Sequence, residues 1–268
     1  KNLSTSAIAR MNLFLHGAED FHIERGDTLR LPAFYSGDSL ATFDCVIANP
    51  PFSLEKWGDD VWLNDPYGRN FAGLPPAKSG DFAWVQHMIK SMARKTGRMA
   101  VVLPHGVLFR GGAEGRIRQK LIEDNLLDAV IGLPANLFPT TSIPVAILVF
   151  DRAREKGGER EGCRDVLFID ASREFQAAKT QNALLDSQLD KIVATHAARR
   201  DVDKYAHVAP LSEIAENDYN LNIPRYVDTF EEEEEIDVAA VEQEIERLEA
   251  ELVEVRARMK QYLKELGV

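Results

Sequence analysis

The chain has 268 residues, of which 45% are hydrophobic and 28% are charged, and its formal net charge is −11. This balance is that of an ordinary globular protein with one large domain, or a domain and an appendage. No apolar run approaches the ~20 residues of a membrane span, and no signal peptide opens the chain, so we expect no membrane partner. Only Cys45 and Cys163 are present, which argues against a disulfide framework and favours a reducing cytoplasm.

The chain opens with Lys1, and residues 1–17 read as a helix. A chain that begins inside an element looks like a fragment or a processed product. The next apolar stretches are Phe21-His22-Ile23, which we expect to form a short strand, and residues 43–48, which we expect to form a buried strand.

Strands and helices then alternate along the chain. A long irregular segment at 53–80 is rich in Gly, Pro, Asn and Trp, and such segments are usually functional or disordered. Residues 151–163 read as a charged loop. The patterns predict helices over 81–95, 112–124 and 184–198 and strands over 97–104, 127–133, 145–150 and 166–169. This alternation indicates an α/β domain with a largely parallel sheet.

The C-terminal segment, 231–268, has the clearest periodicity and carries 13 acidic and five basic residues, a net charge of −8. Its apolar residues step alternately by three and four positions, which is an a/d heptad seam over about four heptads. So narrow a stripe favours a partner helix, although a helix folded back on its own domain is the alternative. The seam residues are Val238, Val241, Ile245, Leu248, Leu252, Val255, Met259, Tyr262 and Leu266.

The stretch FDCVIANPPFS (43–53) raises a chemical question, because a buried strand leads directly into Asn49-Pro50-Pro51-Phe52. Ligands of open α/β sheets sit beyond the carboxyl ends of the strands. An aromatic amine is a poor nucleophile, and a site can improve it by accepting both of its N–H bonds. The Asn49 side-chain oxygen and the Pro50 carbonyl offer two acceptors, and proline fixes the backbone that holds them. Phe52 offers a face on which a base can stack.

A plain structural explanation of the same residues is a strand that ends in a Pro-Pro turn, with Asn49 as a local cap. The preceding strand favours the chemical interpretation. So does the long segment that follows, which could close over an extruded base.

These residues belong to a wider pattern that resembles a known family. After an apolar strand, NPPF resembles the catalytic motif of the amino-group DNA methyltransferases that use S-adenosylmethionine. The whole set, which covers nearly the entire chain, resembles the modification (methyltransferase) subunit of type I restriction–modification systems. In order, the blocks are ARMNLFLHG (9–17), GDTL (26–29), FDCVIANPPFS (43–53), LPHGVLFR (103–110), IGLPANLF (131–138), IPVAILVF (143–150), FIDAS (168–172) and NDYNLNIPRYV (217–227).

The resemblance implies N6-adenine methylation of DNA, with Asn49, Pro50, Pro51 and Phe52 holding an extruded adenine. It implies that Asp27 lies near the adenine moiety of S-adenosylmethionine, where its carboxylate would accept from the cofactor's amino group. The plain alternative for Asp27 is a turn residue after Gly26. The family's partners are DNA, a specificity subunit that selects the sequence, and a restriction subunit. The heptad helix is the expected dock for the specificity subunit.

One departure from the family is that its glycine-rich cofactor loop and the acidic residue that holds the cofactor ribose are not in this chain. We therefore expect the larger C-terminal portion of a subunit. Its fold is expected to be an α/β, Rossmann-like methyltransferase sheet, incomplete at its N-terminal side, with a C-terminal α-helical coiled-coil extension. The expected division is a catalytic core at 1–150, a family-specific extension at 151–230 and an assembly helix at 231–268.

Three functional hypotheses follow. The chain is part of an adenine-N6 DNA methyltransferase, it methylates another planar nitrogen such as that of an RNA base or a protein glutamine, or it is a non-catalytic assembly piece. The six histidines show no metal-ligand spacing, and with two scattered cysteines a zinc site is not expected. RGGAEGR (110–116) lacks the residues of a phosphate loop and reads as a helix entry. Arg110 is a candidate contact for a DNA phosphate, with a solvated helix face as the alternative.

Overall fold

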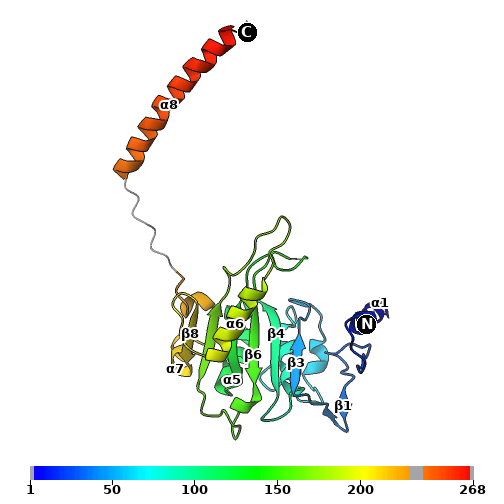
Figure 1. Cartoon of the computed structure of the whole chain (residues 1–268). Helices are drawn as coiled ribbons and strands as arrows, with labels where there is room; N and C mark the ends of the chain where they lie inside the picture. Colours follow the sequence, from blue (N-terminus) through cyan, green and yellow to red (C-terminus); the bar gives the residue numbers. More distant parts are fainter. Residues whose placement is uncertain (1–2, 140, 230–237, 266–268) are drawn as a thin grey trace. The chain divides into compact units, whose positions relative to one another are not determined.

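The computed structural model of the chain describes residues 3–139, 141–229 and 238–265. It divides into two compact units, Lys1–Thr229 and Phe230–Val268. The first unit is built on a six-stranded sheet, and Figure 1 shows its strands side by side with helices packed on them. In spatial order the strands are β3 (Cys45–Ala48), β4 (Arg98–Pro104), β6 (Val145–Asp151), β5 (Leu127–Gly132), β7 (Asp165–Asp170) and β8 (Ala206–Pro210).

The sheet is mixed, which corrects the expectation of a largely parallel one. Strand β3 is parallel to β4, and β5 is parallel to β7. Strand β6 runs antiparallel to both of its neighbours, β4 and β5, and β8 runs antiparallel to β7. The reason lies in the connection from β5 to β6, which contains no helix among its described residues. A parallel neighbour needs a crossover, usually helical, whereas an antiparallel one does not.

The helices begin and end close to the predicted bounds. Helix α3 stops at Lys90 rather than at residue 95, and several short elements in the first unit, among them β1, β2, α2, α4, α7 and β8, were not predicted. A small two-stranded hairpin, β1 (Tyr35–Ser36) with β2 (Ser39–Leu40), precedes β3. The helices are α1 (Leu3–Leu15), α2 (Asp59–Trp62), α3 (Asp81–Lys90), α4 (Gly106–Phe109), α5 (Gly112–Glu123), α6 (Asp186–Ala198), α7 (Leu211–Glu216) and α8 (Val238–Glu265), with 3-10 turns η1 (Arg152–Arg154) and η2 (Ile223–Arg225).

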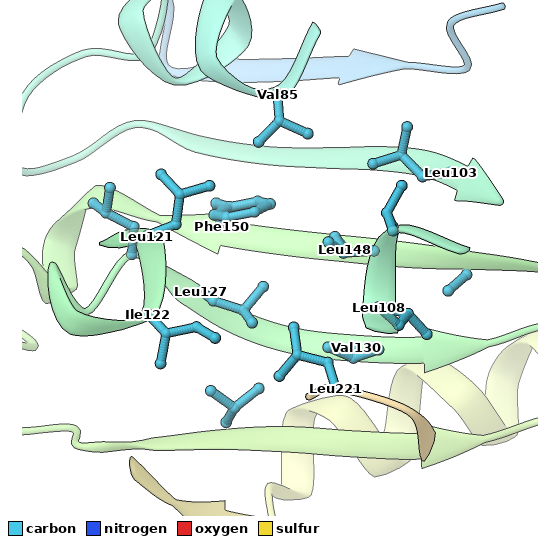
Figure 2. Close-up of a cluster of buried hydrophobic side chains, with 14 of the residues drawn as sticks. Val85, Leu103, Leu108, Leu121, Ile122, Leu127, Val130, Leu148, Phe150 and Leu221 are labelled. Atoms are coloured by element: carbon cyan, nitrogen blue, oxygen red, sulfur yellow. The ribbon is translucent and has the colours of Figure 1, made fainter. Parts of the chain in front are cut away.

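Two apolar layers cover the two faces of the sheet, because successive strand residues point to opposite sides. In β7, Val166 and Phe168 belong to one layer, while Leu167 and Ile169 belong to the other. The first layer receives α3, α4 and α5, and Figure 2 shows its side chains lying against the strands. The second layer receives α6 through Ile192. The unit is therefore a three-layer α/β/α arrangement.

Strand β3 is at the edge of this sheet and is exposed, which corrects the expectation of a buried strand. The side chain of Ile47 is 77% exposed, and Cys45 is exposed as well. Residues 21–23, expected to form a strand, are not part of any strand. A three-residue apolar stretch becomes a strand only when a neighbour pairs with it, and β3 pairs with β4 alone.

The irregular segment after β3 is packed rather than loose. Trp57 and Trp62 are buried and meet edge to face, with ring centroids 5.0 Å apart. The indole of Trp57 donates to the Pro76 carbonyl and that of Trp62 to the Leu29 carbonyl, each at 2.9 Å. This anchoring does not support the idea that the middle of the segment moves as a lid over an extruded base.

The second unit consists of helix α8. Side chains of the heptad seam, among them Leu248, Leu252 and Val255, are exposed within the chain. The last seam residue, Leu266, and the acidic start of the tail at 231–237 lie outside the described residues. No described helix combines the length and the apolar character that crossing a membrane requires.

Candidate functional site

The carboxyl ends of β3, β4 and β5 lie at the same end of the sheet, because these strands all point the same way. A cavity of about 620 Å³ lies there. Its lining comes from the turn after β3, the segment after β4 and the loop between β5 and β6. The lining residues are Asn49, Pro50, Pro51, Phe52, Ser53, Pro104, His105, Gly106, Phe109, Arg110, Phe138, Thr141 and Ile143.

The turn after β3 contains both exposed and buried residues. Pro50 is buried, whereas Asn49 and Pro51 are exposed and Phe52 is half-buried. Within the described residues, neither the Asn49 side chain nor the Pro50 carbonyl forms a hydrogen bond. Neither of the two acceptors named from the sequence is engaged within the described residues, and neither titrates.

Two aromatic rings of the cavity lining pack against each other. Phe52 and Phe138 meet edge to face, with centroids 6.3 Å apart and planes at 89°. Phe138 comes from the loop after β5. It is far from Phe52 in the sequence, and the order of the strands in the sheet places the two rings together. The exposed ring of Phe109 lies on the same lining. Planar aromatic surfaces of this kind suit a stacked base.

His105 directly follows β4, and its imidazole adds two ring nitrogens to the lining. Its Nε2 lies 3.1 Å from the Val145 carbonyl, which can only accept, so Nε2 carries the proton. Burial lowers the pKa of His105, although the bond to Val145 and the nearby Asp170 carboxylate oppose that shift. The imidazole is therefore held as its neutral form, with Nδ1 as an acceptor.

The structure does not bring Asp27 into this cavity. The Asp27 carboxylate accepts the Arg30 amide at 3.3 Å and lies 3.9 Å from the Arg30 guanidinium. Its neighbours Gly26 and Thr28 line a second cavity of about 220 Å³. Ala48 also lines the second cavity, so the two cavities flank the end of β3. Trp84 lines it too, and its buried indole Nε1 has no hydrogen-bond partner within the described residues.

Sequence reasoning found the turn but missed the residues that complete its surroundings. His105, Phe109 and Phe138 all lie within blocks that follow β4 and β5, namely LPHGVLFR and IGLPANLF. These residues could have been found from their position along the chain, because both blocks follow strands whose carboxyl ends lie at the same end of the sheet. In the described part of the chain, no group of three or more His, Cys, Asp or Glu side chains is arranged to hold a metal ion.

Comparison with known proteins bears on this arrangement. The family model described as N-6 DNA Methylase matches residues 1–235. The type I restriction enzyme MjaVII methylase subunit of Methanocaldococcus jannaschii is 36% identical over 95% of this chain and 44% of its own length. The type I restriction enzyme MpnII methylase subunit of Mycoplasma pneumoniae is 30% identical over 100% of this chain and 49% of its own length.

A solved structure agrees with these relatives. The type I restriction-modification system methyltransferase subunit from Streptococcus thermophilus shares 44% identity and a TM-score of 0.76, over 85% of this chain and 47% of that chain. The chain thus spans about half the length of the relatives it matches. The strand, turn and cavity described above are part of this shared sequence, and the chain belongs to the N-6 DNA methylase family.

Proposed function

We propose that the chain carries the target-base pocket of an adenine-N6 DNA methyltransferase, as part of the modification subunit of a type I restriction–modification complex. The observation that carries the proposal is the position of the exposed Asn49 beside Pro50 on the cavity lining, which Phe52 and Phe138 share. Within the described residues, neither the Asn49 side chain nor the Pro50 carbonyl forms a hydrogen bond. Membership of the N-6 DNA methylase family favours adenine over an RNA base or a protein glutamine.

The turn would act by positioning and electrostatics. Asn49 Oδ1 and the Pro50 carbonyl would accept the two hydrogens of the adenine amine, which would concentrate its lone pair on N6. Phe52 would stack on the base, and Phe138 would bound it from the loop after β5. Because N6 lies inside the duplex stack, the adenine would have to be extruded to reach these groups.

S-adenosylmethionine would supply the methyl group when bound. The second cavity, about 220 Å³, is smaller than the ~300–1,000 Å³ of typical ligand sites, so the described residues fit only part of this molecule. The indole N–H of Trp84, which has no partner within the described residues, offers a donor for that part. Asp27 lies between Gly26 and Thr28, which line the cavity, and we propose it as the residue on the adenine side of the cofactor. We propose that a glycine-rich segment preceding residue 1 in the complete protein supplies the rest.

The exposed edge of the sheet supports the same proposal. Strand β3 carries the turn, yet no strand in the described part of the chain pairs with its outer edge, and Ile47 is 77% exposed. A bare apolar edge is a ready template for another strand. We propose that a strand of the preceding segment pairs there. With the catalytic core at 1–150, residues 151–230 would serve as a family-specific extension that widens the sheet through β7 and β8.

The proposed partners are DNA, a specificity subunit and a restriction subunit. The apolar side chains of α8 that lie exposed at heptad spacing support a helical partner, and we propose the specificity subunit as that partner, with 231–268 as the assembly helix.

Methyl transfer from labelled S-adenosylmethionine to duplex DNA tests the function, with the chain extended by its preceding segment and assembled with the specificity subunit. Asn49→Ala removes one acceptor and should lower kcat by roughly 100-fold or more, the usual cost of losing one such group. Asn12→Ala, on the exposed face of α1, is the control. Transfer by Asn49→Ala at the wild-type rate would reject the proposal.

A calorimetric titration separates an active site from a non-catalytic piece. Micromolar S-adenosylmethionine binding by residues 1–268 alone, about −8 kcal/mol, would mean that the visible residues suffice. We expect no measurable binding by this chain and recovery of binding when the preceding segment is restored. No recovery would favour the assembly-piece hypothesis.

A further inference from the structure

Asp81 is the first residue of α3 and is fully buried, yet its carboxylate contacts two walls of the candidate site. One oxygen, Oδ1, accepts the backbone N–H of Ser53 at 2.7 Å. The other, Oδ2, lies 3.2 Å from the Arg110 guanidinium and 3.2 Å from the Ser79 hydroxyl. Ser53 directly follows Phe52, so this carboxylate holds the end of the turn that starts at Asn49.

The bond to Ser53 matters because of the backbone at that residue. Ser53 has a φ of 48°, in the left-handed region that a residue with a Cβ enters at a cost. A conformation of this kind persists only where the surroundings hold it. The Asp81 carboxylate holds this conformation through the Ser53 N–H, on the residue that directly follows Phe52.

The turn that ends at Ser53 is one wall of the site that Asp81 contacts, and Arg110 is the other. Its guanidinium lies against Gly106, where an added Cβ would come within 2.5 Å of Arg110 Nε. Two buried carboxylates pair with this guanidinium, that of Asp81 at 3.2 Å and that of Glu114 at 3.5 Å. The backbone carbonyl of Arg110 is held by Arg118 at 2.9 Å. The Arg110 side chain is 37% exposed, and Arg110 belongs to the cavity lining.

We propose that Asp81 is a positioning residue that sets both walls, with Arg110 as the contact for a phosphate of the DNA strand that carries the extruded adenine. This rests on the proposed function. Arg is suited to phosphate because its planar fork of donors matches phosphate oxygens. The geometry separates two effects of Asp81, since Oδ1 holds the turn and Oδ2 holds Arg110.

Two substitutions exploit that separation in the complete methylase assembled with its specificity subunit. Asp81→Asn keeps an oxygen for the Ser53 amide but loses the charge that orients Arg110. It should weaken DNA binding about tenfold and lower the salt slope of log affinity by about one, the signature of one lost phosphate contact. Arg110→Ala should do the same, and the double variant should be no weaker than Arg110→Ala alone.

Asp81→Ala also frees the Ser53 amide. It should show the same loss of affinity and, in addition, abolish the fluorescence rise of DNA with 2-aminopurine at the target position, because the Phe52 wall is displaced. Asp81→Asn should retain that rise at saturating protein.

Asp151→Asn is the matched control for burial. Asp151 is equally buried, accepts the Ala153 N–H at 2.8 Å and pairs with arginines, but lies at the other end of β6. It should lower the melting temperature and leave affinity and salt slope unchanged. A salt slope unaltered by Asp81→Asn, an equal change in Asp151→Asn, or no DNA binding by the wild-type complex would overturn the inference. These measurements use no methyl transfer, so the Asn49 test can fail or succeed separately.

Discussion

At the scale of single residues, the candidate site relies on groups that stay neutral. Asn49 does not titrate, and the Pro50 acceptor is a carbonyl. The neighbouring His105 is kept neutral by burial, which lowers its pKa. We therefore expect the site to bind its base by fixed acceptors and not by a tuned carboxylate.

A second neutral histidine gives a testable pH dependence. Burial lowers the pKa of His87 from 6.5 to about 4, the Arg69 guanidinium adds to the shift, and the Asp65 carboxylate opposes it. Above pH 6.5 the imidazole is neutral in both the folded and the unfolded chain. As the pH falls below 6.5, the unfolded chain takes up a proton that the folded chain refuses until about pH 4, so the free energy of unfolding falls.

His87→Gln removes that titration and keeps a neutral acceptor near Arg69. Between about pH 7.5 and 5, wild type should lose about 2 kcal/mol more than the variant, measured by urea unfolding at each pH. Equal losses in the two proteins would show that burial does not hold His87 neutral.

Residues 49–52 could be predicted from the sequence because the signal is local, an apolar strand that runs into two prolines. The rest of the site is not local. Asp81 reads only as a helix start, and its contact with Ser53 exists because α3 packs where the turn ends. Phe138 reaches Phe52 only through the strand order of the sheet, which no short stretch specifies.

At the scale of elements, a buried ion cluster ties β5, β6, β7 and α6 together at the end of the sheet opposite the site. Asp128 of β5 lies within 4 Å of Arg154, Arg160 and Arg199. Burial opposes its charge, but the nearby His196 and the three arginines outweigh burial and lower the pKa of Asp128. Arg154 itself is fully buried, 2.7 Å from Asp128.

Arg154→Met should therefore destabilise the first unit by about 3–5 kcal/mol, because it removes a fully buried cation that pairs with the buried Asp128 carboxylate. Arg98→Met is the matched control, since Arg98 pairs with Asp151 of the same cluster at 3.5 Å but is largely exposed. Its cost should not exceed about 1 kcal/mol. Urea unfolding measures both, and equal costs would contradict a role for burial.

Helix α8 allows a test of the proposed docking surface with two neighbouring positions. Leu252 is on the heptad seam and Val253 is off it, and both are exposed within the chain. Leu252→Glu should weaken co-assembly with the specificity subunit by about 30-fold or more, from the loss of about 2 kcal/mol of apolar burial. Val253→Glu should assemble normally, and circular dichroism should show both variants folded.

The doubled change Leu248→Glu with Leu252→Glu should abolish co-purification altogether. Retention of the specificity subunit by that variant would exclude the seam as its dock.

The elements show why a sequence pattern can give the class and miss the topology. Alternating helices and strands correctly indicated an α/β unit, but β6 turned out antiparallel because no helix separates it from β5. The composition of β3 resembles that of an interior strand, yet Ile47 is exposed, since exposure depends on which strand pairs beside it. Strand β8 was missed because AHVAP has little apolar alternation and ends in proline.

At the scale of the whole molecule, the chain has features that fit one part of a larger protein complex. The target-base cavity lies at the end of β3, the cofactor-side cavity is small, and the outer edge of β3 has no pairing strand. The helical second unit presents an unpaired apolar seam. These features fit the proposal that a preceding segment completes the cofactor site and that a helical partner binds α8.

The most direct test is nucleoside analysis by mass spectrometry of DNA methylated by the assembled protein. The account predicts N6-methyladenine as the sole new nucleoside with wild type and none above background with Asn49→Ala, while Asn12→Ala matches wild type. N6-methyladenine formed equally by Asn49→Ala, or a methylated cytosine in its place, would contradict the assignment of this turn as the adenine pocket.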